Sequence, residues 1–183
     1  MNTVMNDEII LETERLLFRQ HITADVDRYC AMEMDPEVRR YVGGYPRTRE
    51  EAEHKFQASL KPVTNRLSMW ATVFKPEKNY IGRCGIYPHF KPDGGTFPGE
   101  ASLGLYIAKA YWNKGFATEA GKAFIDLGFD ELKLNRIVTM VQVGNDASVR
   151  VLEKLGFVVT ETEIGKRSFY HFELKPNKSE SRY

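Results

Sequence analysis

Hydrophobic residues recur along the chain with two periods, one typical of strands and one typical of helices, so the two kinds of element are mixed along the chain rather than segregated. The strand-like segments span residues 9–19, 68–74, 80–90, 100–108, 136–143, 157–164 and 168–174. The helix-like segments span residues 23–34, 114–132 and 145–155, and a further helix begins at Thr48. The order β-α-α-β-β-β-α-β-α-β-β predicts an α+β protein with helices on both sides of one mixed sheet.

Local signals mark where several of these elements begin and end. Thr48 and Glu51 form a capping box, in which each side chain accepts a hydrogen bond from an unpaired N–H at the helix start. The pair Asp35–Pro36 is expected to end the first helix, because the residue before a proline avoids the helical conformation. Gly156 is expected to end the helix over 145–155 in the left-handed conformation. Residues 91–99 hold three glycines and two prolines, which predicts a loop.

The composition excludes several classes of protein. The chain has 183 residues, with 26 Lys and Arg against 25 Asp and Glu, a formal net charge of +1 and a hydrophobic share of 42%. These values predict a single domain over residues 1–183. A nearly neutral chain lacks the basic surface typical of nucleic-acid binding, so no nucleic-acid partner is expected. No apolar run reaches the ~18 residues of a transmembrane helix, so no membrane partner is expected either.

The N-terminus and the cysteines indicate the compartment. Residues Met1–Glu8 contain two acidic residues and no basic one, and no apolar segment with a cleavage site follows, so a signal peptide is not expected. Cys30 and Cys84 lie far apart and form no C-x-x-C motif. They are expected to be free thiols in a reducing compartment, and the predicted location is cytoplasmic.

The segment from Leu103 to Ala120 is the most informative for chemistry. It predicts a buried strand, a tight connection and a helix whose first turn holds small residues at Gly115 and Ala117. A helix N-terminus presents unpaired N–H groups and a partial positive charge, so this turn is suited to an anion. A purely structural turn explains Gly115 equally well. No metal is expected, because no ligand spacing links the histidines, which are His21, His54, His89 and His171.

Two segments carry a resemblance to a known family, YWNKGFATEA at Tyr111–Ala120 and NDASVRVLEKLGF at Asn145–Phe157. Together they resemble the GNAT superfamily of acetyl-CoA-dependent N-acetyltransferases, most closely the branch that includes ribosomal-protein N-terminal acetyltransferases. The segments LETERL at Leu11–Leu16 and DPEV at Asp35–Val38 also fit that branch, so the resemblance covers roughly residues 10–174. It implies a GNAT-like fold with a largely antiparallel sheet. It also implies transfer of acetyl from acetyl-CoA, as co-substrate, to a protein N-terminus or small amine by direct attack in a ternary complex.

The resemblance implies where acetyl-CoA binds. The pyrophosphate is expected on the backbone amides of the turn from Trp112 to Ala117, where Trp112 replaces the family's usual Gln or Arg. A bulge is expected to part the strand end at 105–107 from the next strand, so that pantetheine pairs with it and one N–H polarises the thioester carbonyl. Asn145 is expected beside pantetheine, although helix capping explains it equally. The cofactor residues are therefore Leu105, Tyr106, Ile107, Trp112, Asn113, Lys114, Gly115, Phe116, Ala117, Thr118 and Asn145.

The catalytic groups depart from the family pattern. Many GNAT enzymes use a Tyr to protonate the leaving thiolate, but this chain has Leu152 there, and Ser148, one turn earlier, is the candidate substitute. Relatives commonly carry an acid two residues before the strand glycine, where this chain has Ser102. Glu100 shares the strand face of Ser102 and is the candidate general base, although a solvated acid at a strand end explains it equally. Weaker candidates for the base are Glu33, Glu50 and Glu119.

The acceptor amine is expected to bind between the early helices and the sheet. The candidate groove residues are Tyr41, Tyr45, Trp70 and Tyr87, each of which ordinary packing explains as well. The expected partners are acetyl-CoA and an amine, and the chain is expected to be a monomer or a homodimer. Because Leu152 and Ser102 replace the family's acidic groups, the alternative function is a non-catalytic acyl-CoA-binding or protein-interaction module on the same fold.

Overall fold

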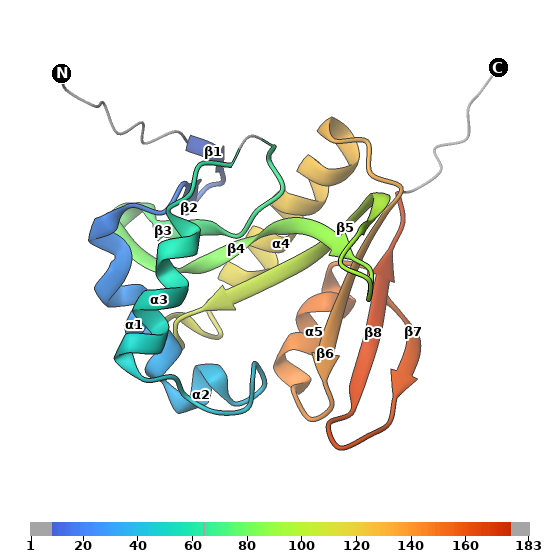
Figure 1. Ribbon diagram of the computed structural model, residues 1–183. Helices are drawn as coiled ribbons and strands as arrows, with labels where there is room; N and C mark the ends of the chain where they lie inside the picture. The colour runs from blue at the N-terminus through green and yellow to red at the C-terminus, as the bar shows by residue number, and fades with distance from the viewer. Residues whose placement is uncertain (1–8, 64, 177–183) are drawn as a thin grey trace.

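The computed structural model describes residues 9–63 and 65–176, whose strands join into one sheet (Figure 1). The strands follow the order β1-β2-β3-β4-β5-β6-β8-β7 across the sheet. Their bounds are β1 (Ile9–Glu12), β2 (Leu16–Arg19), β3 (Trp70–Phe74), β4 (Asn79–Phe90), β5 (Thr96–Ile107), β6 (Arg136–Gln142), β7 (Val158–Glu163) and β8 (Phe169–Leu174). All neighbours run antiparallel except β5 and β6, which are parallel. The prediction of an α+β protein with a mixed, largely antiparallel sheet is therefore confirmed.

Helices cover both faces of this sheet. They are α1 (Val26–Met34), α2 (Pro36–Arg39), α3 (Arg49–Ser59), α4 (Phe116–Asp126) and α5 (Asp146–Lys154). Tyr29 of α1 and Phe56 of α3 pack with Tyr80 of β4 in one buried cluster. Phe116 of α4 packs with Ile81 in a larger cluster. Because successive side chains of a strand point to opposite faces, α1 and α3 cover one face and α4 the other.

The segment over residues 9–19, predicted as one strand, is two antiparallel strands, β1 and β2. Thr13 makes the turn between them, because its N–H donates to the Leu16 carbonyl at 2.9 Å and its hydroxyl accepts from the Leu16 N–H at 3.0 Å. The prediction was wrong here because the ragged apolar pattern contains no glycine or proline to mark the turn.

Two other boundaries differ from the prediction. Helix α1 ends at Met34 as expected, but the chain then starts the short helix α2, with Pro36 at its first position. The side chain of Asp35 accepts from the N–H groups of Glu37 and Val38, so it caps α2 as well as ending α1. Strand β5 begins at Thr96, inside the predicted loop over 91–99.

The predicted helix caps are confirmed. Thr48 and Glu51 form the reciprocal capping box at the start of α3. Gly156, just past the end of α5, has a φ of +86°. Helix α4 begins at Phe116, two residues later than predicted, because Gly115 is its left-handed N-cap with a φ of +81°. A π-helical turn, Leu127–Glu131, extends it at the other end.

Strands β5 and β6 pair over a short length and then part. Their parallel register runs from Glu100 opposite Arg136 to Ser102 opposite Val138. Beyond Ser102, β5 continues to Ile107 paired with β4 alone, and Figure 1 shows β5 and β6 diverging from there. The sheet therefore has a gap between β5 and β6 beyond Ser102.

Candidate functional site

The edge of β5 that faces the gap offers the peptide groups of Leu105 and Ile107. The Ala108 N–H donates to the Ile81 carbonyl at 2.8 Å, which makes these two residues a hydrogen-bonded pair of the β4–β5 ladder. Bonded and non-bonded pairs alternate along antiparallel strands, so Ile107 and Leu105 belong to non-bonded pairs with Gly82 and Cys84. Their N–H and C=O groups therefore point away from β4, toward the gap.

Two side chains already bond to carbonyls on this edge. Thr139 of β6 donates from its hydroxyl to the Leu103 carbonyl at 3.0 Å. The indole Nε1 of Trp112 donates to the Ile107 carbonyl at 2.6 Å. The other groups that face the gap are both peptide groups of Leu105 and the N–H of Ile107. The peptide groups of Tyr106 face β4 instead, which corrects its predicted pairing with pantetheine.

The N-terminal turn of α4 lies next to this strand end. Asn113 and Gly115 both have positive φ, of 59° and 81°. The Glu119 N–H donates to the Gly115 carbonyl at 3.0 Å as the first bond of the helix. The N–H groups of the three residues before Glu119 therefore have no acceptor within the helix, and they face outward at its positive end. This geometry suits an anion.

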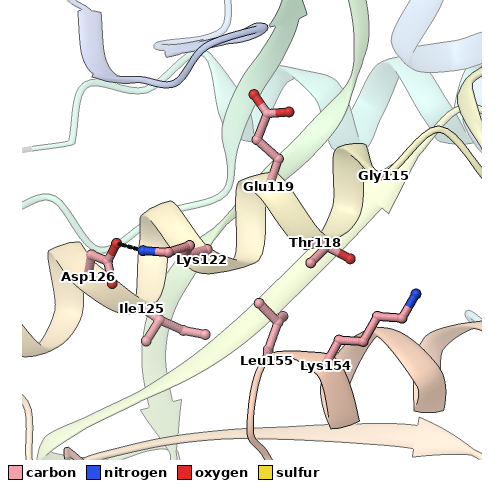
Figure 2. Close-up of a pocket in the computed structure, with 8 residues that line it drawn as sticks. All are labelled: Gly115, Thr118, Glu119, Lys122, Ile125, Asp126, Lys154 and Leu155. Atoms are coloured by element: carbon pink, nitrogen blue, oxygen red, sulfur yellow. Dashed lines mark hydrogen bonds and ion pairs between the residues drawn. The ribbon is translucent and has the colours of Figure 1, made fainter.

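A groove runs from this turn between α4 and α5 (Figure 2), with a volume of about 640 Å³. It is lined by Gly115, Thr118, Glu119, Lys122, Ile125, Asp126, Lys154 and Leu155. Lys122 donates to Asp126 at 2.7 Å, so the charge of Lys122 is balanced. Lys154 comes from the facing helix, where it adds a positive charge to the groove. The helix N-terminus at one end of the groove and Lys154 on its wall are suited to a phosphorylated ligand.

Glu119, a weaker candidate for the base, is bonded to the β1–β2 turn. Its carboxylate accepts from the Thr13 hydroxyl at 2.6 Å and from the N–H and Nε of Arg15 at 2.9 and 2.7 Å. Burial opposes the ionisation of Glu119, but these hydrogen bonds outweigh it and lower the pKa of the carboxyl group. A carboxylate held in this way is a poor proton acceptor.

Glu100, the candidate base, lies at the closed end of the gap. Its carboxylate is 2.8 Å from His89 Nδ1 and accepts from Arg136 Nη2 at 2.8 Å. Burial opposes ionisation, but these partners lower the pKa of Glu100 below its usual value. Glu100 comes five positions before Leu105 on the same strand, a separation of about 17 Å at the rise of an extended chain. A general base must reach its proton directly or through one water, so this position does not suit the predicted role.

Asn145 and Ser148 lie in the N-terminal turn of α5, which follows β6 along the chain. The side-chain oxygen of Asn145 accepts from the Ser148 N–H at 3.3 Å, so Asn145 is the N-cap of α5. Leu152 is buried in the core shared with α4. The capping interpretation of Asn145 is therefore confirmed, while contacts of Asn145 and Ser148 with a ligand stay predictions.

The four aromatic residues predicted to line an acceptor groove lie in different environments. Trp70 is only 2% exposed and belongs to the core, so its assignment to a groove was wrong. Tyr45 is exposed on the connection between α2 and α3. Tyr41, on the same connection, reaches Gly144, where an added Cβ would lie 3.8 Å from its ring. Tyr87 of β4 is half-buried opposite Ser102, and burial raises the pKa of its hydroxyl.

A cluster of three arginines around Glu33 was not anticipated as a unit. The Glu33 carboxylate lies 3.2 Å from Arg39, 2.6 Å from Arg47 and 2.6 Å from Arg83. The Arg83 guanidinium also stacks 4.8 Å from the ring centre of Tyr106. Burial opposes the ionisation of Glu33, but Arg83 and Arg47 outweigh it and lower its pKa, so Glu33 is also a poor base. Three positive charges against one negative leave two positive charges in excess.

Comparison with known proteins decides the family. Residues 15–158 match the model of the acetyltransferase (GNAT) domain. This chain belongs to the GNAT acetyltransferases. It is 34% identical over 152 residues to N-acetyltransferase p20 of Bacillus licheniformis, an alignment that covers 80% of this chain and 81% of p20.

Two further proteins are similar to a part or to most of the chain. The “Putative ribosomal N-acetyltransferase YdaF” of Bacillus subtilis is 41% identical over 59 residues, 32% of each chain. A GNAT-family acetyltransferase structure from Bacillus anthracis superposes with a TM-score of 0.77 at 22% identity, over 90% of this chain and 97% of that one. The expected fold is thereby confirmed, as is the resemblance to a family that includes ribosomal acetyltransferases.

Other features were sought in the part of the chain that the structure describes. No helix among residues 9–63 and 65–176 is long and apolar enough to cross a membrane. Within the same residues, no three His, Cys, Asp or Glu side chains are grouped to hold a metal ion. Cys30 and Cys84 are buried free thiols, as predicted. The signal-peptide expectation concerns residues 1–8, which lie outside the described residues.

Proposed function

We propose that this GNAT acetyltransferase moves an acetyl group from acetyl-CoA to a primary amine, which attacks the thioester directly in a ternary complex. The observation that carries the proposal is the gap between β5 and β6, which exposes the peptide edge at Leu105 and Ile107. An extended chain can pair with a free strand edge as an added strand does. The bond from Trp112 to Ile107 ties this edge to the anion-binding turn of α4, so one ligand can span both.

The residues around the gap suit three parts of acetyl-CoA. The pyrophosphate would lie on the free N–H groups of Phe116, Ala117 and Thr118, in the turn shaped by the residues before them. The nucleotide would occupy the groove beside Lys154. Pantetheine would run along the edge of β5 toward Asn145. The bound thioester supplies an activated acetyl group, and the Leu105 N–H, which lies farther along β5 from the pyrophosphate turn than Ile107 does, would donate to the thioester oxygen as negative charge develops there.

Proton transfers are assigned to groups on either side of the gap. Ser148 is proposed as the donor to the leaving thiolate, because its hydroxyl lies in the first turn of α5 and Leu152 carries no proton to give. For the amine, the positive excess around Glu33 lowers the pKa of the ammonium group in place of a carboxylate base, so that the amine loses its first proton to bulk water before it attacks. A positively charged neighbour lowers the pKa of an ammonium group and so raises the fraction of neutral amine. After attack, the nitrogen releases its second proton through water to Ser148, which replaces the proton given to the thiolate.

The same positive excess favours one class of acceptor. Arg83 stacks on Tyr106 on the face of the sheet opposite α4, which is the face left for the acceptor if the cofactor occupies the α4 side. A polyamine would bring several positive charges toward this cluster, whereas a protein N-terminus or a monoamine brings one. We expect spermidine to be a poorer acceptor than a short peptide with a free N-terminus, and the difference to shrink with added salt because salt screens repulsion. Equal kcat/KM for both acceptors at low salt would contradict this.

Thiol release separates an enzyme from the alternative, a non-catalytic module. Purified protein is incubated with acetyl-CoA, with and without pooled peptides and small amines, and the free CoA thiol is measured. Release that depends on amine supports the enzyme. Calorimetric binding of acetyl-CoA without amine-dependent release would support the module instead. Ser102 and Leu152, where relatives carry acidic groups, are the reason to make the comparison.

A further inference from the structure

The turn between β1 and β2 is attached to the first turn of α4, on the other side of that turn from α5. Arg15 lies 104 positions from Glu119, yet its Nε donates to one carboxylate oxygen at 2.7 Å and its backbone N–H to the other at 2.9 Å. The Thr13 hydroxyl donates to the same carboxylate at 2.6 Å. Glu119 points away from α5 in Figure 2. Three hydrogen bonds of this kind fix a side chain far more firmly than one exposed ion pair does.

Arg15 also holds the backbone of the anion-binding turn. Its Nη1 donates to the Lys114 carbonyl at 2.9 Å, and its guanidinium lies 4.4 Å from the ring centre of Phe116. A Cβ added to Gly115 would lie 3.4 Å from Nη2. The guanidinium therefore contacts the residues on both sides of Gly115.

The bond to Lys114 determines the direction of the next N–H group. A peptide bond is planar and trans, so the Lys114 carbonyl and the Gly115 N–H point in opposite directions. When Arg15 holds the carbonyl on its own side, the Gly115 N–H is directed away from Arg15. Gly115 lines the α4–α5 groove, whereas Arg15 does not.

Arg15 also balances a charge that would oppose anion binding. Glu119 lines the groove and sits in the first turn of α4, within the region expected to hold pyrophosphate. Without Arg15 its negative charge would be unpaired and would repel a phosphate group. Arg15 therefore acts on the turn in two ways, through the Lys114 peptide and through Glu119.

We propose that Arg15 is a positioning residue for the cofactor site, which directs the amides of the α4 turn toward the pyrophosphate and neutralises Glu119 beside it. The inference rests on the proposed function only in that the turn binds the pyrophosphate of CoA. It predicts an effect confined to the phosphate-bearing part of the cofactor. A residue with only a structural role would lower stability without distinguishing CoA from a fragment that lacks phosphate.

The test compares Arg15→Gln, Glu119→Gln and the double variant with wild type. CoA and pantetheine dissociation constants are measured by calorimetry, together with KM and kcat for acetyl-CoA. Arg15→Gln should weaken CoA binding by about tenfold, the effect of losing one hydrogen bond to a charged group. Pantetheine affinity and kcat should stay within about twofold. The double variant should bind CoA more tightly than Arg15→Gln alone, because the unpaired charge of Glu119 is gone.

Arg66→Gln is the matched control. Like Arg15, Arg66 joins a backbone carbonyl to a carboxylate, but its partners are the Ile10 carbonyl of β1 and Glu131, at the far end of the α4 segment. It should alter the melting temperature without changing CoA affinity. Unchanged CoA affinity in a folded Arg15→Gln variant, or an equal loss for CoA and pantetheine, would overturn the inference. No recovery in the double variant would overturn the charge argument.

The two proposals fail in different ways. Wild-type protein that binds CoA but acetylates no amine refutes the proposed function, and the binding comparison still tests Arg15. Wild-type protein that binds no CoA refutes both. Amine-dependent transfer with an unaffected Arg15→Gln variant refutes the inference alone.

Discussion

The indole Nε1 of Trp112 donates to the carbonyl of Ile107 at 2.6 Å, and this bond joins the turn before α4 to the last residue of β5. The family usually has Gln or Arg at the position of Trp112, and the bond gives the tryptophan a role of its own. It occupies the carbonyl of Ile107 and leaves the N–H of the same residue facing the gap. Pantetheine and pyrophosphate would bind on either side of this bond.

Replacing Trp112 with Phe keeps an aromatic ring but removes the donor. A typical hydrogen bond contributes about 1 kcal/mol, so the KM for acetyl-CoA should rise about fivefold as the turn loses its link to β5. Trp112→Gln retains a donor and should lose less affinity than Trp112→Phe. Steady-state kinetics with acetyl-CoA as the varied substrate measure both. Identical KM values for the Phe variant and wild type would show that the bond has no part in cofactor binding.

Replacing Gly115 with Val tests the anion-binding turn. Gly115 has a φ of +81°, a conformation that costs other residues about 1–2 kcal/mol. Gly94 has a φ of +86° in an exposed loop, with no atom within 4 Å of an added Cβ. Gly94→Val should therefore introduce similar backbone strain far from the site. Both variants should lose similar stability in thermal denaturation. CoA affinity should fall at least tenfold for Gly115→Val alone, and equal affinities in the two variants would refute the assignment.

The elements that could be predicted from sequence are those with local signals. Thr48, Glu51 and Gly156 act on backbone groups within a few residues of themselves, so the sequence pattern is enough to find them. The gap between β5 and β6 has no such signal, because it depends on which strands pair and where the pairing stops. The family resemblance predicts the gap, and the register of β5 against β4 identifies the residues that face it.

The candidate site shows the same limit. Arg15 and Glu119 are adjacent in space but 104 positions apart, so nothing near Glu119 in the sequence marks its partner. Glu100 meets Arg136 through the parallel pairing of β5 and β6, a pairing that no local sequence signal predicts. Trp70 alternates correctly for a strand, but the pattern does not tell which face of a central strand is covered. Helices cover both faces of the sheet, so the side chain of Trp70 is buried in the core and lines no groove.

Glu100→Gln tests whether the carboxylate takes part in the chemistry. A lost general base lowers the rate about 10²–10⁴-fold. Because Glu100 is bonded to Arg136 far from Leu105, we expect kcat within about twofold of wild type across the pH range. The variant should instead lower stability by about 1–3 kcal/mol, since Arg136 loses a charged partner. A large loss of kcat with acetyl-CoA binding intact would restore Glu100 as the base.

Stability should fall in mild acid because of a single buried histidine. His21 is 3% exposed and lies against the rings of Tyr29, Phe56 and Tyr80. Burial lowers the pKa of His21 to about 4, helped by Arg83 and opposed by Asp25. In the unfolded chain the pKa is about 6.5, so between these values the unfolded state binds a proton that the folded state does not. The free energy of unfolding should therefore fall as the pH is lowered, by up to about 3 kcal/mol at pH 4 relative to neutral pH.

The pH window separates this effect from that of the carboxylates. Groups whose pKa is lowered in the folded state, such as Glu33 and Glu119, lose their stabilising contribution only as pH falls below the unfolded value of about 4.3. Urea denaturation at pH 7, 6, 5 and 4.5 therefore samples mainly His21. His21→Phe keeps a ring among the same aromatic neighbours but cannot bind a proton, so its stability should change little over this range. A slope as steep in His21→Phe as in wild type would assign the acid sensitivity to other groups.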